Sequence, residues 1–137
     1  MKKLVYLISP KKIYNNFYDD LKKVLAAKNV KFFQLRLKKV KKLKIIKIAK
    51  KIKKITKRYK VNLIINDHPD ISKTINADGC HLGQKDVSAI DLKKYLKNQI
   101  IGITCHNSKF FAKIALQNNA DYLAFGSFNK SKLKPNA

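Results

Sequence analysis

The chain has 137 residues, of which 45% are hydrophobic and 29% are charged. This composition is typical of one globular domain, and it excludes collagen-like material and intrinsic disorder. The charge is unusual, because 32 basic residues against 8 acidic ones give a formal net charge of +24. Every acidic residue is an aspartate, and only Arg36 and Arg58 are arginines, so the excess comes almost entirely from lysine.

Two interpretations of the lysine excess are open. The lysines could bind a polyanion such as a nucleic acid, since they gain affinity by releasing phosphate counterions. Alternatively, the composition reflects drift in an AT-rich genome, because lysine, isoleucine and asparagine are over-used together while glutamate and tryptophan are absent. We favour drift, because the lysines are spread along the chain, and we expect no nucleic-acid partner.

Cysteine usage and the lack of a targeting segment predict a cytoplasmic protein. Cys80 and Cys105 are too few for a disulfide framework, which fits a reducing compartment. The apolar stretch at residues 4–8 is too short for the core of a signal peptide, and Pro10 follows it closely. The longest apolar runs fall far below the roughly 20 residues of a membrane span, so we expect no membrane partner.

Short, continuously apolar runs alternate with amphipathic stretches along the chain. Runs of this kind are typical of strands buried on both faces of a parallel sheet. Their spacing matches a series of repeated βα units. We therefore expect six parallel strands, at residues 4–9, 32–37, 61–67, 79–83, 100–105 and 122–126.

The stretches between these strands have the periodicity of helices with one apolar face. In the clearest one, Ile45, Ile48 and Ile52 recur at helical spacing and lysines fill the opposite face. We interpret these lysines first as the solvent-exposed face of a helix in the outer layer. A stripe that binds polyanions is the second interpretation. We expect helices at residues 16–29, 41–59, 70–76, 88–97 and 108–119, with N-caps at Ser88 and at Asn107 or Ser108.

The order of these elements predicts an α/β fold in one domain. No linker, low-complexity tract or sequence repeat beyond the βα alternation is evident. Right-handed crossovers of this length lead either to an open doubly wound sheet or to a (β/α)8 barrel. In both folds ligands bind at the carboxyl ends of the strands, so polar residues there are the most informative.

The second expected strand carries the most distinctive polar residues. Alternation places Gln34, Arg36 and Lys38 on one face, with the aromatic and leucine residues on the other. An arginine inside a barrel needs an anion, and only a guanidinium offers a planar, bidentate fork for phosphate. This strand therefore predicts a phosphate-bearing ligand.

Two carboxylates follow neighbouring strands. Asp67 comes directly after Asn66 at the end of the third strand, and Asp86 lies in the loop after the fourth. Mg²⁺ is bound by one or two carboxylates together with the phosphate oxygens of a substrate, so this pair would suit a magnesium site. The residues alone favour the structural alternative, with Asp67 capping the next helix and Asp86 capping a helix or pairing with a lysine.

The last two strands end in weaker signals. Thr104 offers a hydroxyl at the rim of the sheet. The loop after Gly126, which includes Ser131 and Lys134, could hold phosphate through backbone N–H groups and an ammonium.

The cysteine–histidine pairs do not predict zinc. Cys80-His81 and Cys105-His106 tempt such an interpretation, but neighbours on one strand point to opposite faces, so the four side chains cannot converge. We expect His81 and His106 to be hydrogen-bonded strand-end or interior side chains.

Five segments at the strand ends occur in a recognisable order. They are Gln34-Leu35-Arg36-Leu37-Lys38, Asn66-Asp67, His81-Leu82-Gly83-Gln84-Lys85-Asp86, Gly102-Ile103-Thr104-Cys105-His106 and Ser131-Lys132-Leu133-Lys134. Together they resemble the thiamine phosphate synthase and thiazole tautomerase family. In that family the segments read Gln-Leu-Arg-Glu-Lys, Asn-Asp, His-Leu-Gly-Gln-x-Asp, Gly-x-Ser-x-His and Thr-x-Thr-Lys.

The resemblance implies a (β/α)8 barrel transferase of thiamine biosynthesis. Such an enzyme couples hydroxymethylpyrimidine diphosphate to thiazole phosphate and releases pyrophosphate, giving thiamine monophosphate without a protein nucleophile. By this resemblance Mg²⁺ is the cofactor, held by Asp67 and Asp86. The residues implied for the pyrimidine diphosphate are Gln34, Arg36, Lys38, Asn66, Thr104 and Lys134, and Ser131 would lie against the thiazole phosphate.

The chain departs from the family pattern in two groups of positions. The mild departures are Leu37 for a glutamate, which alternation directs away from the ligand, and Thr104 for a serine, which keeps the hydroxyl. The stronger ones concern the phosphate loop, where Leu133 replaces a hydroxyl-bearing threonine and Ser127 and Lys130 stand in place of prolines. Six strands are also fewer than a barrel needs, so we expect residues 1–137 to be one truncated domain without the last two βα units. Two alternatives are a thiazole tautomerase-like protein and a non-enzymatic, polyanion-binding remnant of the barrel. A homo-oligomer is possible in each case.

Overall fold

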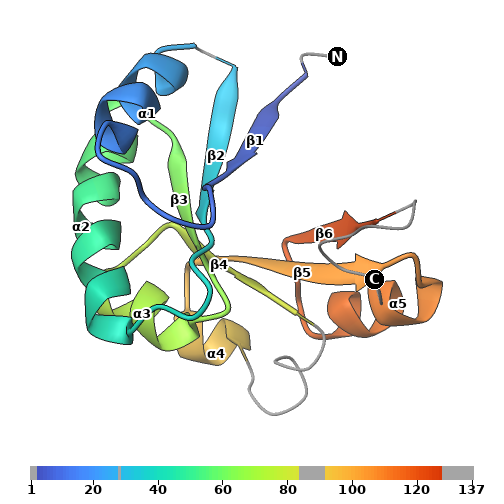
Figure 1. Ribbon diagram of the computed structural model, residues 1–137. Helices are drawn as coiled ribbons and strands as arrows, with labels where there is room; N and C mark the ends of the chain where they lie inside the picture. Colours follow the sequence, from blue (N-terminus) through green and yellow to red (C-terminus); the bar gives the residue numbers. More distant parts are fainter. Residues whose placement is uncertain (1–2, 28, 84–91, 128–137) are drawn as a thin grey trace.

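The apolar runs form the six strands of one parallel sheet, shown in Figure 1. The structure is a computed structural model and describes residues 3–27, 29–83 and 92–127. The strands are β1 (Val5–Ile8), β2 (Val30–Leu35), β3 (Asn62–Asn66), β4 (Gly79–Leu82), β5 (Ile100–His106) and β6 (Tyr122–Phe125). The helices between them are α1 (Phe17–Leu25), α2 (Lys42–Arg58), α3 (Pro69–Thr74), α4 (Leu92–Leu96) and α5 (Lys109–Gln117).

The predicted elements are confirmed in kind and order, and their ends differ by a few residues. The largest consequence is in β2, which ends at Leu35, so Arg36 and Lys38 follow the strand instead of lying within it. The hydroxyl of Ser108 accepts a hydrogen bond from the N–H of Phe111 at 3.3 Å, which confirms it as the N-cap of α5. The other expected N-cap, Ser88, lies outside the described residues.

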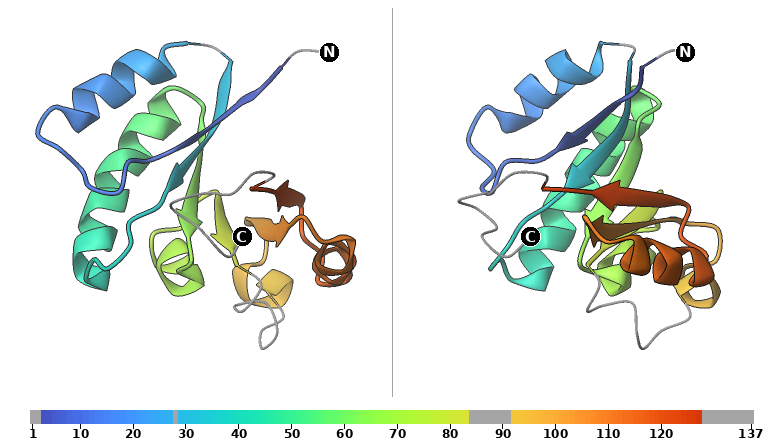
Figure 2. Two further views of the ribbon diagram at one scale, coloured as in Figure 1. Left: turned by 45° about the vertical axis from the view of Figure 1, so that its right-hand side comes forward. Right: turned by 90° about the vertical axis from the view of Figure 1, so that its right-hand side faces the viewer.

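The strands are hydrogen-bonded in their sequence order, from β1 to β6. A doubly wound sheet reverses its strand order at a switch point, whereas a barrel does not, so this order favours the barrel interpretation. The sheet curls, with the helices on its outer side, as Figures 1 and 2 show. The curl brings the hydroxyls of Tyr6 on β1 and Tyr122 on β6 to 2.6 Å, although these strands are at opposite edges of the sheet.

The hydrophobic core lies between the outer face of the sheet and the helices. On α2, the side chains of Ile45, Ala49, Ile52 and Thr56 are buried, and they recur at helical spacing toward the sheet. The lysines of this helix lie on its other sides. None of the helices in the described parts of the chain combines the length and apolar character that a membrane span requires.

A short repeat fixes the start of two strands. The tripeptide Asn-Ala-Asp precedes both β4 and β6, and its asparagine is left-handed in each case, with φ of 50° and 57°. The carboxylate of Asp78 accepts a hydrogen bond from the N–H of Leu63 at 2.7 Å, and Asp121 accepts one from Ile101 at 2.8 Å. Each aspartate therefore ties its strand to the neighbouring one. The sequence analysis did not identify this repeat.

Candidate active site

The side chain of Gln34 points into the curl of the sheet, as alternation along β2 predicts. It is only 3% exposed, and its Nε2 donates a hydrogen bond to the Tyr6 hydroxyl at 2.9 Å. Leu37 is buried in the core on the helix side, which confirms that it faces away from this interior. One detail differs from prediction: Phe32 lies on the interior face too, stacked on Tyr6 with ring centroids 5.5 Å apart.

A continuous chain of hydrogen bonds crosses the interior from Gln34 to Thr104. The hydroxyl of Tyr6 meets that of Tyr122 at 2.6 Å, and Tyr122 meets His81 Nδ1 at 2.9 Å. His81 Nε2 then lies 2.9 Å from Thr104 Oγ1. We call these five side chains the interior chain. Two residues assigned to the ligand by resemblance therefore lie at its two ends.

The interior chain contains two side chains that the sequence analysis did not single out, Tyr6 and Tyr122. In the sequence they stand only as members of apolar runs. His81 was predicted to be a hydrogen-bonded interior histidine, which the structure confirms through both ring nitrogens. One feature of the sequence could have identified them. Each is a tyrosine, with a polar hydroxyl, within the apolar run that forms β1 or β6. The contact between their hydroxyls could not be predicted from the sequence, because it depends on the curl of the sheet.

Burial keeps the tyrosine hydroxyls protonated. Loss of solvent raises the pKa of Tyr122, and its hydrogen bond with Tyr6 raises it further. Loss of solvent also raises the pKa of Tyr6, although its hydrogen bonds with Tyr122 and Gln34 act in the opposite direction. Both groups are therefore neutral near pH 7, and each has one proton to donate.

A glycine on β5 makes room for this arrangement. A Cβ atom placed on Gly102 would collide with the ring and hydroxyl of Tyr122. The missing side chain allows that ring to lie across β5, where it stacks on His81 with centroids 5.6 Å apart. Gly102 is the first residue of the fourth family-like segment, so its steric role gives a physical reason for glycine at that position.

Arg36 and Lys38 lie just beyond the carboxyl end of β2. The backbone N–H of Arg36 donates to the Ser9 hydroxyl at 2.9 Å, which ties this segment to the end of β1. The Arg36 side chain is half-buried and that of Lys38 is exposed. Both cations thus lie just beyond the carboxyl end of β2, on a segment that a backbone hydrogen bond holds to the end of β1.

The metal hypothesis rests on an exposed carboxylate at the end of β3. Asp67 has a φ of 61°, and its backbone N–H donates to the carbonyl oxygen of His81 at 2.9 Å. The helix after it begins with His68 as the N-cap, so the structure does not support Asp67 as that cap. Asn66 beside it is buried, at 9% exposure. Asp67 is therefore available to a ligand at this edge.

Several predicted residues lie outside the described part of the chain. They are Asp86, Ser131 and Lys134. Within the described ranges no cluster of three histidine, cysteine, aspartate or glutamate side chains could hold a metal ion. Cys80 is fully buried with the outer core while His81 joins the interior chain, as expected for neighbours on opposite faces. A hard oxygen donor such as Asp67 fits Mg²⁺, which takes few protein ligands.

His106 differs from prediction at the end of β5. Its Nδ1 is buried and has no hydrogen-bond partner among the residues that the structure describes, and the same holds for the Ser127 hydroxyl. Within the described residues the expectation of a hydrogen-bonded side chain is not met at this ring nitrogen. The His106 ring lies edge-on to the Phe111 ring, with centroids 6.3 Å apart.

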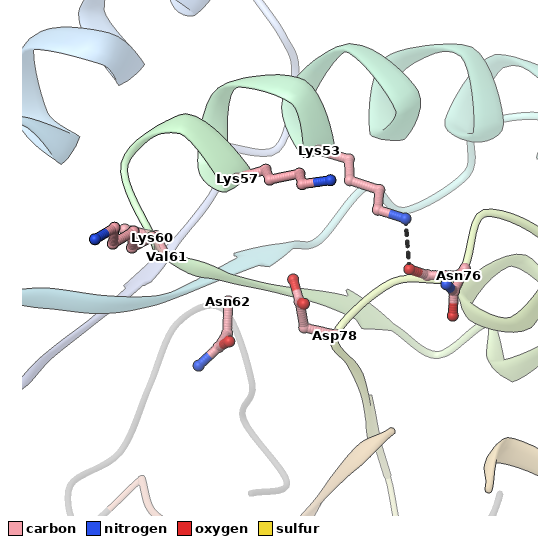
Figure 3. Close-up of a pocket in the computed structure, with 7 residues that line it drawn as sticks. All are labelled: Lys53, Lys57, Lys60, Val61, Asn62, Asn76 and Asp78. Atoms are coloured by element: carbon pink, nitrogen blue, oxygen red, sulfur yellow. Dashed lines mark hydrogen bonds between the residues drawn. The ribbon is translucent and has the colours of Figure 1, made fainter. Parts of the chain in front are cut away.

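A cavity of about 420 Å³ lies at the opposite end of the sheet, where β3 begins. Figure 3 shows its lining of lysines from the end of α2 and polar residues from the α3–β4 turn. Lys53 donates to the carbonyl oxygens of Ile75 and Asn76, at 2.8 and 2.6 Å, and so holds the end of α3 against α2. This cavity contains none of the predicted ligand residues, and we assign it a structural role.

Comparison with known proteins supports the resemblance. The family model described as thiamine monophosphate synthase matches residues 5–137. A thiamine-phosphate synthase from Pelagibacter ubique is 59% identical over 97% of this chain and 65% of its own length. Another, from Caldicellulosiruptor saccharolyticus, is 33% identical over 96% of this chain and 62% of its own. The chain thus spans less than two thirds of these relatives, which by itself does not confirm the expected truncation.

A solved structure agrees with the sequence relatives. The thiamine phosphate pyrophosphorylase from Pyrococcus furiosus superposes with a TM-score of 0.80 at 26% identity. The superposition covers 93% of this chain and 62% of that protein. The curled parallel sheet, with its strands in sequence order, thus matches the fold of that solved structure. The predicted fold class, α/β of the barrel family, is confirmed. The chain belongs to the thiamine monophosphate synthase family.

Proposed function

We propose that this chain carries the pyrimidine-diphosphate side of a thiamine phosphate synthase site. It would bind hydroxymethylpyrimidine diphosphate and join it to thiazole phosphate, giving thiamine monophosphate and pyrophosphate. The observation that carries the proposal is the interior chain, because Gln34 and Thr104 lie at its two ends. The family relationship and the cations beyond β2 agree with it.

The chemistry requires charge stabilisation rather than a nucleophile. When the bond between the pyrimidine methylene and the diphosphate breaks, the leaving group gains negative charge and the methylene becomes cationic. Arg36 and Lys38 would bind the leaving diphosphate, with Arg36 offering a bidentate fork. The thiazole nitrogen then captures the cationic carbon. Lys134 is proposed to bind the diphosphate, and Ser131 the phosphate of the thiazole.

A divalent cation would assist this departure. Asp67 and Asp86 are the residues proposed to hold Mg²⁺, which would neutralise charge on the diphosphate when bound. Asn66, next to Asp67 and buried, would bind the substrate through its amide. The interior aromatic rings would exclude water from the cationic methylene, since water would otherwise compete with the thiazole nitrogen.

Binding of the pyrimidine diphosphate tests the proposal. Titration calorimetry should show binding that depends on Mg²⁺ and weakens at least tenfold in Gln34→Ala, because the substitution removes a buried hydrogen-bonding group from the site. Gln117→Ala, a change at an exposed residue of α5, should bind like the wild type. No binding, or equal binding by Gln34→Ala, would contradict the proposal.

The polyanion alternative makes an opposite prediction. Binding of RNA or DNA through many lysines should fall steeply between low and physiological salt, and it should not need Mg²⁺. Tight, salt-sensitive RNA binding together with no pyrimidine binding would favour the remnant interpretation. A cytoplasmic location and a homo-oligomer are also part of this proposal, and fractionation and sedimentation would test them.

A further inference from the structure

The cavity at the start of β3 has more polar groups than its structural role uses. Lys53 holds the end of α3, and Asp78 Oδ2 accepts a hydrogen bond from the N–H of Leu63 at 2.7 Å. These contacts do not use the ammonium groups of Lys57 and Lys60 or the second carboxylate oxygen of Asp78. In the described part of the chain the ion pairs all involve other residues. The cavity therefore holds groups of both charges that are not paired with each other.

Capping of α2 does not explain the two lysines at its end. Lysine side chains near a helix C-terminus often bind its last carbonyl groups. In α2 these carbonyls have backbone partners: Thr56 accepts from the N–H of Val61 at 2.9 Å, and Lys57 accepts from the N–H of Lys60 at 3.2 Å. The ammonium groups of Lys57 and Lys60 are therefore available to a ligand.

Opposite charges line the two sides of this cavity. The carboxylate of Asp78 points toward α2, from which Lys53 and Lys57 extend, as Figure 3 shows. A space of about 420 Å³ lies within this lining. That volume is within the range of sites for small molecules. A small molecule can therefore contact the lysines and the carboxylate at once.

The balance of charge in the lining favours a phosphate group. Three lysines and one aspartate leave a formal charge of +2. A phosphate monoester carries nearly two negative charges at neutral pH and balances this excess, whereas a zwitterionic amino acid leaves it uncompensated. The carboxylate of Asp78 repels a phosphate but accepts hydrogen bonds from hydroxyl groups. The lining thus suits a molecule with a phosphate at one end and hydroxyl groups at the other.

We propose that this cavity binds a small phosphorylated sugar, with its phosphate on Lys57 and Lys60 and its hydroxyl groups donating to Asp78. Lys53 adds positive charge and keeps its contacts with α3. The site is at the opposite end of the sheet from the proposed active site and shares no residue with it. It therefore goes beyond the proposed function and stands independently of it.

Calorimetry with ribose 5-phosphate at low salt tests the phosphate contact. Lys57→Met should weaken binding at least tenfold, because it removes a charge-assisted hydrogen bond. Lys47→Met removes the same charge from an exposed position of α2 outside the cavity, so it should bind like the wild type. Both lysines are exposed, and urea unfolding should be unchanged in both variants.

Three outcomes of this titration would overturn the proposal. The first is the absence of saturable binding by the wild type. The second is an equal loss in Lys47→Met, which would mean that the net charge attracts the phosphate without a site. The third is a loss in Arg36→Met instead of Lys57→Met, which would place the phosphate at the carboxyl ends of the strands.

A second comparison tests the contact between the sugar and Asp78. The wild type should prefer ribose 5-phosphate to inorganic phosphate about tenfold, the effect of hydrogen bonds to a charged group. Asp78→Asn keeps an oxygen for the N–H of Leu63 but loses the charge, so the preference should fall toward unity. Asp19→Asn on α1 is the matched control and should keep the preference. Equal binding of the two probes by the wild type would overturn the sugar assignment.

RNA is the other source of phosphate groups that the lysines could bind. A single-stranded RNA oligonucleotide should bind Lys57→Met and the wild type alike, because the proposed site holds a small molecule. RNA binding that depends on Lys57, together with no binding of ribose 5-phosphate, would overturn the proposal in favour of a nucleic-acid surface.

Discussion

In the middle strands of the sheet both faces are buried, but different interactions stabilise them. On β4, Cys80 on the helix side is fully buried among apolar side chains, while the next residue, His81, is 8% exposed and hydrogen-bonded through both ring nitrogens. The packing of the outer face depends on side-chain volume, so this face tolerates replacement by apolar side chains of similar size. The stability of the interior face depends on individual hydrogen bonds, because each buried polar group there needs its hydrogen-bond partner. We therefore expect the outer, helix-covered face of the sheet to supply most of the stability, and the interior face to supply ligand recognition.

The largest effect is expected from a truncation on the outer face. Ile52 in the middle of α2 is fully buried, so Ile52→Ala should lower the free energy of unfolding by about 2–5 kcal/mol through lost burial and a cavity. Urea unfolding followed by circular dichroism measures this. Leu43→Ala on the same helix, at 76% exposure, should change it by less than about 0.5 kcal/mol. Equal losses in the two variants would contradict the assignment of the core to this face.

A smaller loss is expected from crowding the interior face. Gly102→Ala places a methyl group against the Tyr122 ring, so it should cost about 1–3 kcal/mol and displace Tyr122 from His81. In a Tyr122→Ala background the same change should cost much less, since the colliding ring is gone. A double-mutant cycle by urea unfolding measures this coupling. Strict additivity would show that the two residues do not compete for space.

The outer face could be predicted from sequence far more completely than the interior. The periodicity of the apolar residues predicted the strands, the helices and the inward direction of Gln34. Burial against the helix layer makes every second residue of a strand apolar, and every third and fourth residue of a helix. The contact between Tyr6 and Tyr122 joins residues 116 positions apart. It depends on how strongly the sheet curls, which no local pattern contains.

The strand ends show a second limit of the sequence. Alternation predicted Arg36 and Lys38 as continuing the face of Gln34, but β2 ends at Leu35. Beyond that point their side-chain directions are set by the loop and not by the pleat of a strand. Asp67 was compatible with a metal ligand and with a helix cap, and the positive φ at Asp67 with His68 as the N-cap removes the cap alternative. The remaining carboxylate, Asp86, is not among the described residues.

The repeated aspartates offer a comparison between the two halves of the sheet. Asp78→Ala leaves the N–H of Leu63 without its acceptor and should cost about 1–2 kcal/mol, and Asp78→Asn, which keeps an acceptor oxygen, should cost less. Asp121→Ala should behave similarly through Ile101. Chemical unfolding measures each loss. Asp19→Ala on the exposed side of α1 is the control, and a loss as large there would show that charge, and not strand pairing, is responsible.

The smallest effect is expected from an ion pair on the outer layer. Partial burial raises the pKa of Asp70, but the hydrogen bond from Lys42, the N–H of Ile71 and the Lys42 charge together bring it below its ordinary value. A lowered folded-state pKa stabilises the fold above the unfolded-state pKa, and this contribution is lost as pH falls through the folded value. Both side chains are largely exposed, so the contribution at pH 7 should be about 0.5 kcal/mol or less.

The pH dependence of a matched pair of variants isolates this contact. The difference in unfolding free energy between the wild type and Asp70→Asn should be present at pH 7 and absent at pH 2.5, because the carboxyl is protonated there in both folded and unfolded chains. In a Lys42→Met background the difference at pH 7 should shrink, since the partner charge and its hydrogen bond are gone. A difference that grew toward acid pH would mean that the folded state raises the pKa of Asp70 and that the contact with Lys42 does not stabilise the carboxylate.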